Sequence, residues 1–223
     1  MSVMLLCSPH NPTGRVWTRE ELERVADICL KHNVLLVSDE IHCELTMPGR
    51  TFLPLFATGH PVLRQACTCT SASKAFNLAG LQNAQIICLD EVARRKIDRA
   101  VNIHEVCDVN PFGLVATEAA YKGGGEWLDA LRAYLWQNYE GANCPSLRVM
   151  PLEATYLMWL DISATGMSDE EFCQQLIKQY SVRLAPGSHY GHGGEGFVRI
   201  NMATQRERLI QAGRLICKFV NGQ

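Results

Sequence analysis

The chain lacks an excess of charge of either sign. Its 223 residues include 21 lysines and arginines and 23 aspartates and glutamates, so the formal net charge is −2. Nucleic acids and anionic membranes attract strongly basic surfaces, and this balance argues against either as the main partner. We therefore expect no nucleic-acid partner and no membrane partner.

Long hydrophobic runs are also missing. No apolar stretch approaches the roughly 18 residues of a membrane span, and residues 1–7 lack the basic start and cleavage site of a signal peptide. Cysteine, in contrast, is abundant. The ten cysteines are spread along the chain, most of them in apolar runs such as those around Cys29, Cys88 and Cys217. Free thiols of this kind behave as small core hydrophobes, so we expect a cytoplasmic protein with reduced cysteines.

Apolar runs alternate with helical patterns along the first 130 residues. Runs typical of buried strands occur at residues 3–7, 34–37, 66–70 and 84–89, the first of them suited to a parallel sheet. Thr18 begins a helix because Glu21, three residues later, completes a capping box. Further helical patterns cover about 91–101 and 111–121, and residues 47–61 are typical of a loop. This alternation predicts an α/β domain with a mainly parallel sheet.

The pattern changes after Gly123, Gly124 and Gly125. Residues 126–139 have the spacing of one long helix, and Ser168 begins another with Glu171 in the capping-box position. Strands are predicted at residues 156–162, 182–184 and 197–201, and a final helix ends the chain. These elements predict a smaller C-terminal α+β domain at residues 131–223, after a large domain at residues 1–130.

Polar residues follow the ends of three predicted strands. Asn11 follows the first, Asp39 ends the second and Lys74 follows the third. Each has an ordinary explanation by itself, since such residues are common in turns, caps and solvated surfaces. Ligands of α/β sheets bind beyond the carboxyl ends of the strands, however. The convergence of the three on one sheet edge therefore indicates a functional site.

Several short segments of this chain, in their order and spacing, resemble the fold-type I pyridoxal-phosphate (PLP) enzymes, the superfamily of class I and II aminotransferases. The segments are Asn11-Pro12-Thr13-Gly14, Asp39-Glu40-Ile41-His42, Ser71-Ala72-Ser73-Lys74, Ala79-Gly80-Leu81 and Phe197-Val198-Arg199-Ile200-Asn201. The resemblance covers nearly the whole chain. It implies PLP as the cofactor and a PLP-transferase-like large domain, part of a mainly parallel sheet with helices on both faces.

The resemblance also implies roles for the residues that surround the cofactor ring. Lys74 resembles the lysine that holds PLP through a Schiff base and then moves the Cα proton of the substrate. Asp39 would pair with the pyridine nitrogen and keep the ring an electron sink. Asn11 would donate to the phenolic oxygen of the ring. His42 stands where many aminotransferases carry a tyrosine bonded to that oxygen.

The remaining implied roles concern the phosphate and the substrate. Ser71 and Ser73 would bind the phosphate. Arg199, together with Asn11, would hold the α-carboxylate of a small amino-acid substrate through a two-pronged contact. The alternative for Arg199 is a strand residue in a surface salt bridge. Val198 and Ile200 flank it, and a partly buried guanidinium needs an anionic partner, which favours the carboxylate role.

Gln82 departs from the common aminotransferase pattern. Aminotransferases usually carry a phosphate-binding arginine eight residues after the Schiff-base lysine, and a neutral amide cannot supply that charge. Together with residues 39–42, Leu81 and Gln82 resemble the cystathionine β-lyase, or carbon–sulfur lyase, branch. The resemblance then implies α,β-elimination from a sulfur-containing amino acid, which gives a thiol, pyruvate and ammonia.

The Asn-Pro segment usually lies well past the midpoint of the large domain in this superfamily. Here it begins at Asn11, so the chain resembles the C-terminal part of such an enzyme. A sheet that lacks strands exposes apolar edges, which favours dimerisation or aggregation. Family members are usually homodimers, and we expect a homodimer here.

Two other functions stay open. One is an aminotransferase with the same cofactor, which forms an amino acid from a keto acid without releasing ammonia. The other is a non-catalytic fragment or regulatory protein that keeps the fold and the lysine. A metal site is not expected, because His189 and His192 are too few ligands for a closed site.

Overall fold

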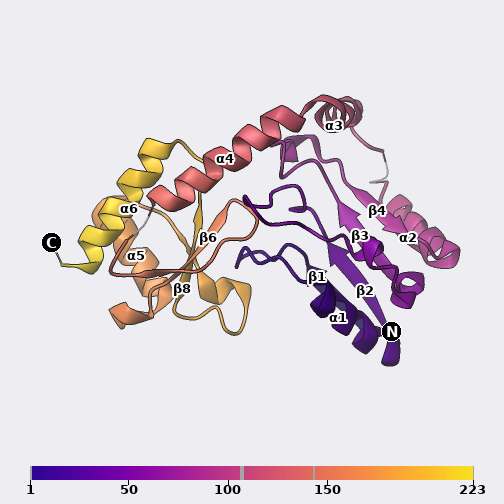
Figure 1. Ribbon diagram of the computed structural model, residues 1–223, viewed down its shortest axis with the longest axis horizontal. Helices are drawn as coiled ribbons and strands as arrows, with labels where there is room; N and C mark the ends of the chain where they lie inside the picture. The colour runs from indigo at the N-terminus through magenta and orange to yellow at the C-terminus, as the bar shows by residue number, and fades with distance from the viewer. Residues whose placement is uncertain (1, 106–107, 143, 223) are drawn as a thin grey trace.

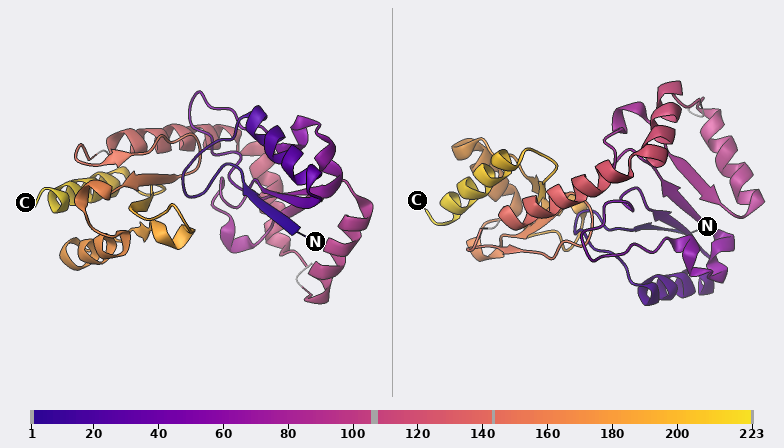
Figure 2. Two further views of the ribbon diagram at one scale, coloured as in Figure 1. Left: turned by 90° about the horizontal axis from the view of Figure 1, so that it is seen from below. Right: turned by 45° about the horizontal axis from the view of Figure 1, so that its top comes forward.

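The computed structural model describes residues 2–105, 108–142 and 144–222 (Figure 1). The molecule is elongated, with a four-stranded sheet in each of two parts, and the long helix α4 (Gly125–Gly141) runs from one part to the other. The two further views show the same division (Figure 2). No helix within the described ranges is long and apolar enough to cross a bilayer.

The first sheet has the strand order β1-β2-β3-β4, and its first three strands are parallel. The strands are β1 (Ser2–Cys7), β2 (Val34–Asp39), β3 (Ala66–Thr70) and β4 (Gln85–Cys88), which runs antiparallel to β3. Cys7 pairs with Asp39, and Asp39 pairs with Cys69, so the parallel strands end side by side. The predicted α/β fold with a mainly parallel sheet is confirmed.

Helix α1 (Arg19–Lys31) packs on one face of this sheet. It begins with the predicted capping box, in which Thr18 and Glu21 each accept a hydrogen bond from the other's backbone N–H. Leu22, Ala26 and Cys29 form the buried face of the helix. Their core partners are apolar residues of the strands and the intervening loop: Leu6, Leu36, Leu55, Val62, Leu63 and Ala66.

The opposite face of the sheet carries exposed apolar side chains. Successive strand residues point to opposite faces, so Val3 and Leu5 point away from Leu6 and the core beneath α1. Val3 is 53% exposed, Leu5 is 74% exposed, and Ile86 of β4 is 47% exposed. The prediction of a buried strand at residues 3–7 is therefore wrong for these side chains, because no described segment packs over them.

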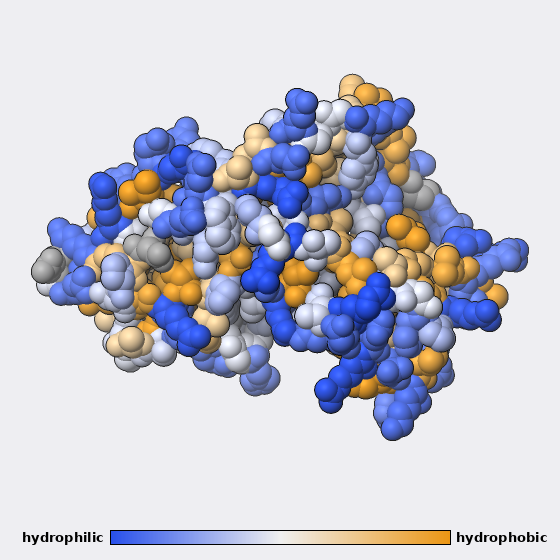
Figure 3. All heavy atoms as spheres, in the orientation of Figure 1, coloured by the Kyte–Doolittle hydropathy of each residue, from blue (hydrophilic) through white to orange (hydrophobic). Residues whose placement is uncertain are grey.

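Helices α2 (Glu91–Ile103) and α3 (Pro111–Gly123) follow the fourth strand and confirm the two helical patterns predicted there. Short 3₁₀ helices lie at Leu55–Thr58, Pro61–Gln65 and Ala79–Leu81, the first of them inside the stretch predicted as a loop. On α3, Phe112 is 77% exposed and Val115 is 68% exposed. Figure 3 shows hydrophobic residues gathered at the surface over this helix.

The second sheet is antiparallel and has the strand order β5-β6-β8-β7. Its strands are β5 (Arg148–Val149), β6 (Leu157–Asp161), β8 (Phe197–Asn201) and β7 (Ala185–Pro186). Helices α5 (Asp169–Tyr180) and α6 (Arg206–Val220) pack around it together with α4. Each helix contributes to the core: Leu135 from α4, Phe172 from α5 and Ile216 from α6. Short 3₁₀ helices lie at Ser163–Thr165 and Gly187–Tyr190. The α+β character predicted for this part is confirmed.

The strand predicted at residues 182–184 is wrong. Helix α5 ends at Tyr180 and is capped by Ser181, which has a left-handed conformation (φ 56°). Pairing with β8 begins only at Ala185, opposite Arg199. Val182 and Leu184 instead pack partly buried against the core of this part. Their apolar pattern therefore reflects burial and not strand pairing.

Helix α4 is continuous across residue 130, where the boundary between residues 1–130 and 131–223 was predicted. Near its start, Trp127 stacks on Phe76 of the first part with ring centroids 5.8 Å apart. Further along the same helix, Leu135 is buried in the core of the second part. The helix thus packs in both parts, and the domain boundary stays a prediction.

Candidate active site

Three loops bring predicted site residues to the carboxyl edge of the first sheet. Asn11 follows β1, Asp39 is the last residue of β2, and Lys74 follows β3. The backbone N–H of Ser8 donates to the carbonyl of Asp39 at 2.9 Å, which ties the first loop to the second strand. The predicted convergence on one sheet edge is therefore observed.

Arg199 reaches the same edge from the second sheet. It lies on β8, and its Nη1 donates a hydrogen bond to Oδ1 of Asn11 at 3.0 Å. None of the ion pairs found among the described residues involves Arg199. The alternative role of Arg199, a strand residue in a surface salt bridge, is therefore not supported. A guanidinium has five donors, and most of them are left for a carboxylate.

The two parts meet at Gly14, three residues after Asn11. The backbone N–H groups of Glu153 and Ala154 both donate to the carbonyl of Gly14, at 2.9 and 2.8 Å. Gly14 has a φ of +71°, and a Cβ there would lie 2.6 Å from Cδ1 of Leu152. Glycine therefore suits the conformation of this junction, and a larger residue would force the Leu152 side chain to shift.

An aromatic stack supports the guanidinium of Arg199. Its Cζ lies 4.7 Å from the centroid of the Tyr190 ring, within the range of a cation–π contact. Tyr190 meets Trp159 edge to face at 5.8 Å, and Trp159 stacks on Phe197 with ring planes 9° apart. The stacked aromatic rings therefore support the position of the Arg199 guanidinium.

His42 is buried beside these cations. Its ring meets Tyr156 edge to face at 5.6 Å, and its Nδ1 has no hydrogen-bond partner among the described residues. Burial, followed by the positive charges of Lys74 and Arg199, lowers the pKa of His42 to about 4. The imidazole is therefore neutral at pH 7, with one buried nitrogen that needs a partner.

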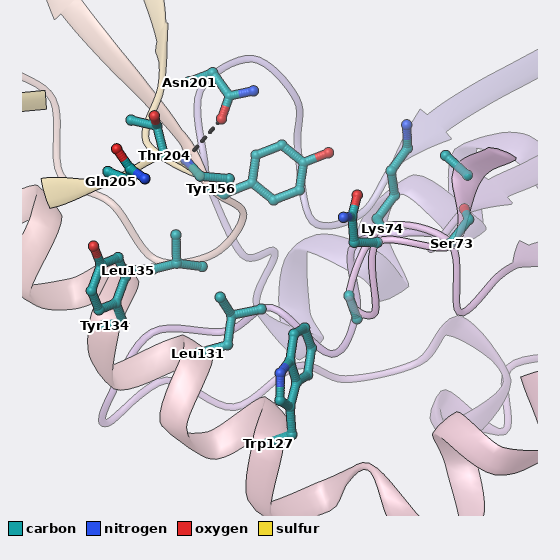
Figure 4. A pocket seen from close by; sticks show the side chains of 14 residues that line it. Ser73, Lys74, Trp127, Leu131, Tyr134, Leu135, Tyr156, Asn201, Thr204 and Gln205 are labelled. Carbon is teal, nitrogen blue, oxygen red and sulfur yellow. Dashed lines mark hydrogen bonds between the residues drawn. The ribbon is translucent and has the colours of Figure 1, made fainter. Parts of the chain in front are cut away.

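Lys74 and Ser73 line a cavity of about 510 Å³ that lies between the loop after β3, α4 and the segment after β8. Figure 4 shows the hydroxyl of Tyr156 directed towards the side chain of Lys74. The positive charge of Lys74 is also one of the causes that lower the pKa of His42. Lys74 therefore lines an open cavity, and its charge acts on the buried histidine.

Ser71 differs from the other predicted residues because its hydroxyl is already used. Its Oγ donates to the carbonyl of Asn83 at 2.6 Å and accepts from the backbone N–H of Ser73 at 3.0 Å. A serine has one hydroxyl hydrogen, so Ser71 braces the Lys74 loop in this arrangement. Gln82 precedes Asn83 and ends a 3₁₀ helix in a left-handed conformation (φ 52°).

Asp39 is half-buried at the end of β2. Its Oδ1 accepts a hydrogen bond from the backbone N–H of Ile41 at 3.2 Å, and Oδ2 accepts none from the described residues. No described hydrogen bond or ion pair joins Asp39 to Lys74. One carboxylate oxygen is therefore available to a ligand.

Two tyrosines were missed by sequence reasoning. Tyr156 lies against His42 and the Lys74 cavity, and Tyr190 lies under Arg199. Tyr156 stands at the start of a predicted strand, and Tyr190 stands in a glycine-rich loop. Neither position differs in pattern from an ordinary packing aromatic, so only the tertiary arrangement reveals them.

The fold and this edge define an α/β protein with a site suited to a small ligand that carries a carboxylate. Arg199 supplies positive charge for an anion, Asp39 supplies negative charge for a cation, and Lys74 supplies an amine that can hold or move a proton. His42 supplies a neutral nitrogen. This set can bind an organic cofactor together with an amino acid.

The chain belongs to the aminotransferase class I and II family, whose family model matches residues 1–213. It is 41% identical over 207 residues to cystathionine beta-lyase PatB of Bacillus subtilis strain 168, which covers 90% of this chain and 54% of that protein. It is 38% identical over 216 residues to protein MalY of Escherichia coli strain K12, which covers 93% of this chain and 54% of that protein.

A solved structure agrees in fold. The crystal structure of cystalysin from Treponema denticola, which contains a pyridoxal 5'-phosphate cofactor, matches with a TM-score of 0.93 and 32% identity. The match covers 99% of this chain and 58% of that one. The chain therefore spans about half the length of the curated relatives it matches.

Proposed function

We propose that this chain carries the lysine-bearing part of a PLP-dependent carbon–sulfur β-lyase. The reaction is α,β-elimination from a cysteine thioether, which gives a thiol, pyruvate and ammonia. The observation that carries the proposal is the grouping of Lys74, His42, Asn11 and Arg199 at one sheet edge. The similarity to a cystathionine beta-lyase supports this reaction over others of the family.

His42 provides a test of whether PLP fits. A buried nitrogen without a partner costs free energy, and a ligand that supplies a hydrogen-bond acceptor removes that cost. The phenolic oxygen of PLP is such an acceptor. Asn11 fits the same oxygen, because its Oδ1 accepts from Arg199 and its Nδ2 is left to donate.

The remaining residues fit the other groups of the cofactor. Asp39 would accept a hydrogen bond from the protonated ring nitrogen through its free carboxylate oxygen. Ser73 would donate to the phosphate from the wall of the cavity. The amine of Lys74 would bond to the aldehyde carbon of PLP. Ser71 would join the phosphate contacts only if its hydroxyl left the carbonyl of Asn83.

The chain's own residues then divide the work of elimination. PLP, when bound, supplies an electron-withdrawing ring that stabilises negative charge at the substrate Cα. Lys74 Nζ takes the proton from Cα as the general base. Arg199 binds the α-carboxylate and holds the amino acid beside Lys74. The Cβ–S bond breaks with its electron pair on sulfur, which then takes up a proton and leaves as a thiol. The electron pair of the Cα–H bond becomes the second bond between Cα and Cβ, and water converts the remaining three-carbon unit into pyruvate and ammonia.

The test is the release of pyruvate from L-cystathionine by the purified chain supplied with PLP. We expect pyruvate and ammonia in equal amounts, and we expect the Lys74→Ala variant to lose both. Pyruvate release no higher than that of the variant contradicts the proposal. Amino-acid formation from a keto acid without ammonia would instead identify an aminotransferase.

A separate measurement distinguishes an enzyme from a non-catalytic protein. Added PLP should give a visible absorbance band that borohydride bleaches. A chain that never develops the band supports the non-catalytic alternative, because the lysine would then serve the fold alone.

We also propose that the protein is a cytoplasmic homodimer. The exposed apolar residues of α3 and of the first sheet support association, since contiguous apolar surface is unusual on a monomer. The nine described cysteines are free, which supports a reducing compartment. Sedimentation equilibrium tests the dimer, and a monomer at micromolar concentration contradicts it.

A further inference from the structure

Helix α6 is fastened to α4 at its first residue, Arg206. The backbone N–H of Arg206 donates to the Tyr134 hydroxyl at 2.8 Å, and its Nε donates to Oδ1 of Asn138 at 3.2 Å. Both partners lie on α4. Residues 203–205, directly before α6, line the cavity beside Lys74. The start of α6 is therefore held in place next to the candidate active site.

The later turns of α6 pass close to the segment that follows α4. A Cβ at Gly213 would lie 3.4 Å from the carbonyl oxygen and 3.8 Å from Cα of Ala142, the residue that caps α4. At the end of α6, the Ser146 hydroxyl donates to Oδ1 of Asn221 at 2.8 Å. Gly213 and Asn221 are about two helical turns apart, so they share one face of α6. This face therefore runs along residues 142–146.

Cys144 and Cys217 lie in the middle of this contact. Cys217 is on the same face of α6, one turn from each of the two outer contacts, and Cys144 is midway along residues 142–146. Both side chains pack in the core of the second part. Burial, followed by a side-chain hydrogen bond with the Cys144 thiol, raises the pKa of Cys217 to about 12. The two thiols are therefore neighbours between α6 and the turn after α4.

The pair lies at the edge of the core. Cys144 is 3% exposed, whereas Cys217 is half-buried, and the Ser146–Asn221 contact one turn away is exposed. A reagent in solution therefore reaches Cys217 before Cys144. Because Cys217 is protonated at pH 7, it reacts slowly with oxidants. The pair therefore responds to a sustained excess of oxidant and not to a brief exposure.

We propose that Cys144 and Cys217 form a reversible disulfide that fastens the end of α6 to the turn after α4 when small-molecule disulfides accumulate. Helix α6 is then held at both ends, by Arg206 at the first and by the sulfur–sulfur bond near the last. Protein disulfides in reducing compartments are usually of this transient, responsive kind. Neither Lys74 nor PLP takes part in the bond, so it does not depend on the reaction proposed above.

The bond forms by two thiol–disulfide exchange steps. The Cys217 sulfur, once deprotonated, attacks one sulfur of a small disulfide such as glutathione disulfide, forms a mixed disulfide and releases the other half as a thiolate. The deprotonated Cys144 sulfur then attacks the Cys217 sulfur and displaces the second half. The two protein thiols lose two electrons and two protons, and the small disulfide takes these up as it becomes two thiols.

Disulfide mapping of the full chain tests the proposal. The protein is incubated with glutathione disulfide, its remaining thiols are blocked, and its peptides are examined by mass spectrometry without reduction. We expect a linked pair of peptides that contains Cys144 and Cys217 and that disappears after treatment with dithiothreitol. A cross-link that joins either cysteine to another one, glutathione left on Cys217, or no oxidation at the two positions overturns the proposal.

Two matched variants separate the disulfide from a general effect of the oxidant. Cys217→Ala removes one partner, and Cys173→Ala removes a buried thiol of α5 from the same core. We expect oxidation to raise the Tm of the parent and of Cys173→Ala by about 5–15 °C, because the bond closes a long loop and constrains the unfolded chain. Cys217→Ala should show no rise. Equal responses of the two variants overturn the proposal.

Discussion

The hydrogen bond from Arg199 to Asn11 joins the two parts of this protein at the candidate active site. It spans 3.0 Å between side chains that are 188 residues apart in the chain. Because it occupies Oδ1 of Asn11, it fixes which atom of the amide faces a ligand, and it leaves most guanidinium donors free. One contact thus couples the substrate arginine to the proposed cofactor site.

Replacing Arg199 should weaken substrate binding more than folding. Arg199→Gln keeps a donor for Asn11 but removes the charge that a carboxylate needs. We expect KM for a cysteine thioether to rise roughly 10- to 100-fold, since hydrogen bonds to charged groups contribute about 1.5–3 kcal/mol. Steady-state kinetics check this, with thermal unfolding as the control for folding. An unchanged KM would place the carboxylate elsewhere.

Tyr190 should act as a positioning residue for Arg199. Tyr190→Leu removes the aromatic face under the guanidinium, while Tyr190→Phe keeps it. We expect the leucine variant to raise KM about two- to fivefold with little change in kcat, because exposed cation–π contacts contribute about 0.5–1 kcal/mol. The phenylalanine variant should behave like the parent. If both variants lose kcat equally, Tyr190 serves only the packing of its loop.

His42 should make stability depend on pH. Its folded-state pKa of about 4 lies below the ordinary value of 6.5, so the unfolded chain binds more protons between these two pH values. The contribution is fully present above pH 6.5 and is lost as the pH falls towards 4. It amounts to about 3 kcal/mol at most, from the size of the shift.

Urea unfolding between pH 4 and 7 measures this contribution. His42→Phe keeps an aromatic ring against Tyr156 and removes the titrating group. We expect the free energy of unfolding of the parent to fall faster towards pH 4 than that of the variant. Parallel pH profiles would show that His42 is protonated in the folded state or is not buried.

Replacing Gly14 should destabilise the junction of the two parts. Gly14→Ala forces a Cβ to within 2.6 Å of Leu152 and imposes a left-handed conformation on alanine, which should destabilise the protein by about 1–3 kcal/mol. Gly49→Ala is a matched control, because Gly49 has a similar φ of +78° and open space around it. Equal losses of stability in the two variants would mean that the close approach to Leu152 contributes nothing.

Much of the sheet edge was predictable because it depends on local pattern. Strand ends followed by Asn11, Asp39 and Lys74 are visible in the sequence, and parallel strands place their carboxyl ends together. The capping box at Thr18 was equally visible, since it involves residues three apart. These features follow from short-range rules that tertiary packing did not override.

Other features depend on contacts that no local pattern records. The apolar run at residues 3–7 predicts a buried strand, but burial of Val3 and Leu5 depends on what packs over them. Val182 and Leu184 have the pattern of a strand and are partly buried without pairing. The place of Tyr156 against His42 follows from how the second part meets the first, and the place of Tyr190 follows from packing against Arg199 and Trp159 within the second part.

The central claim is that Lys74 is the residue that holds PLP, and one measurement tests it most directly. The chain is incubated with PLP, reduced with borohydride and digested, and its peptides are examined by mass spectrometry. We expect the reduced adduct on Lys74, with no comparable labelling of exposed lysines such as Lys122 and Lys178, and we expect Lys74→Ala to remain unlabelled. An adduct spread over the exposed lysines, or one that persists in Lys74→Ala, would contradict this account.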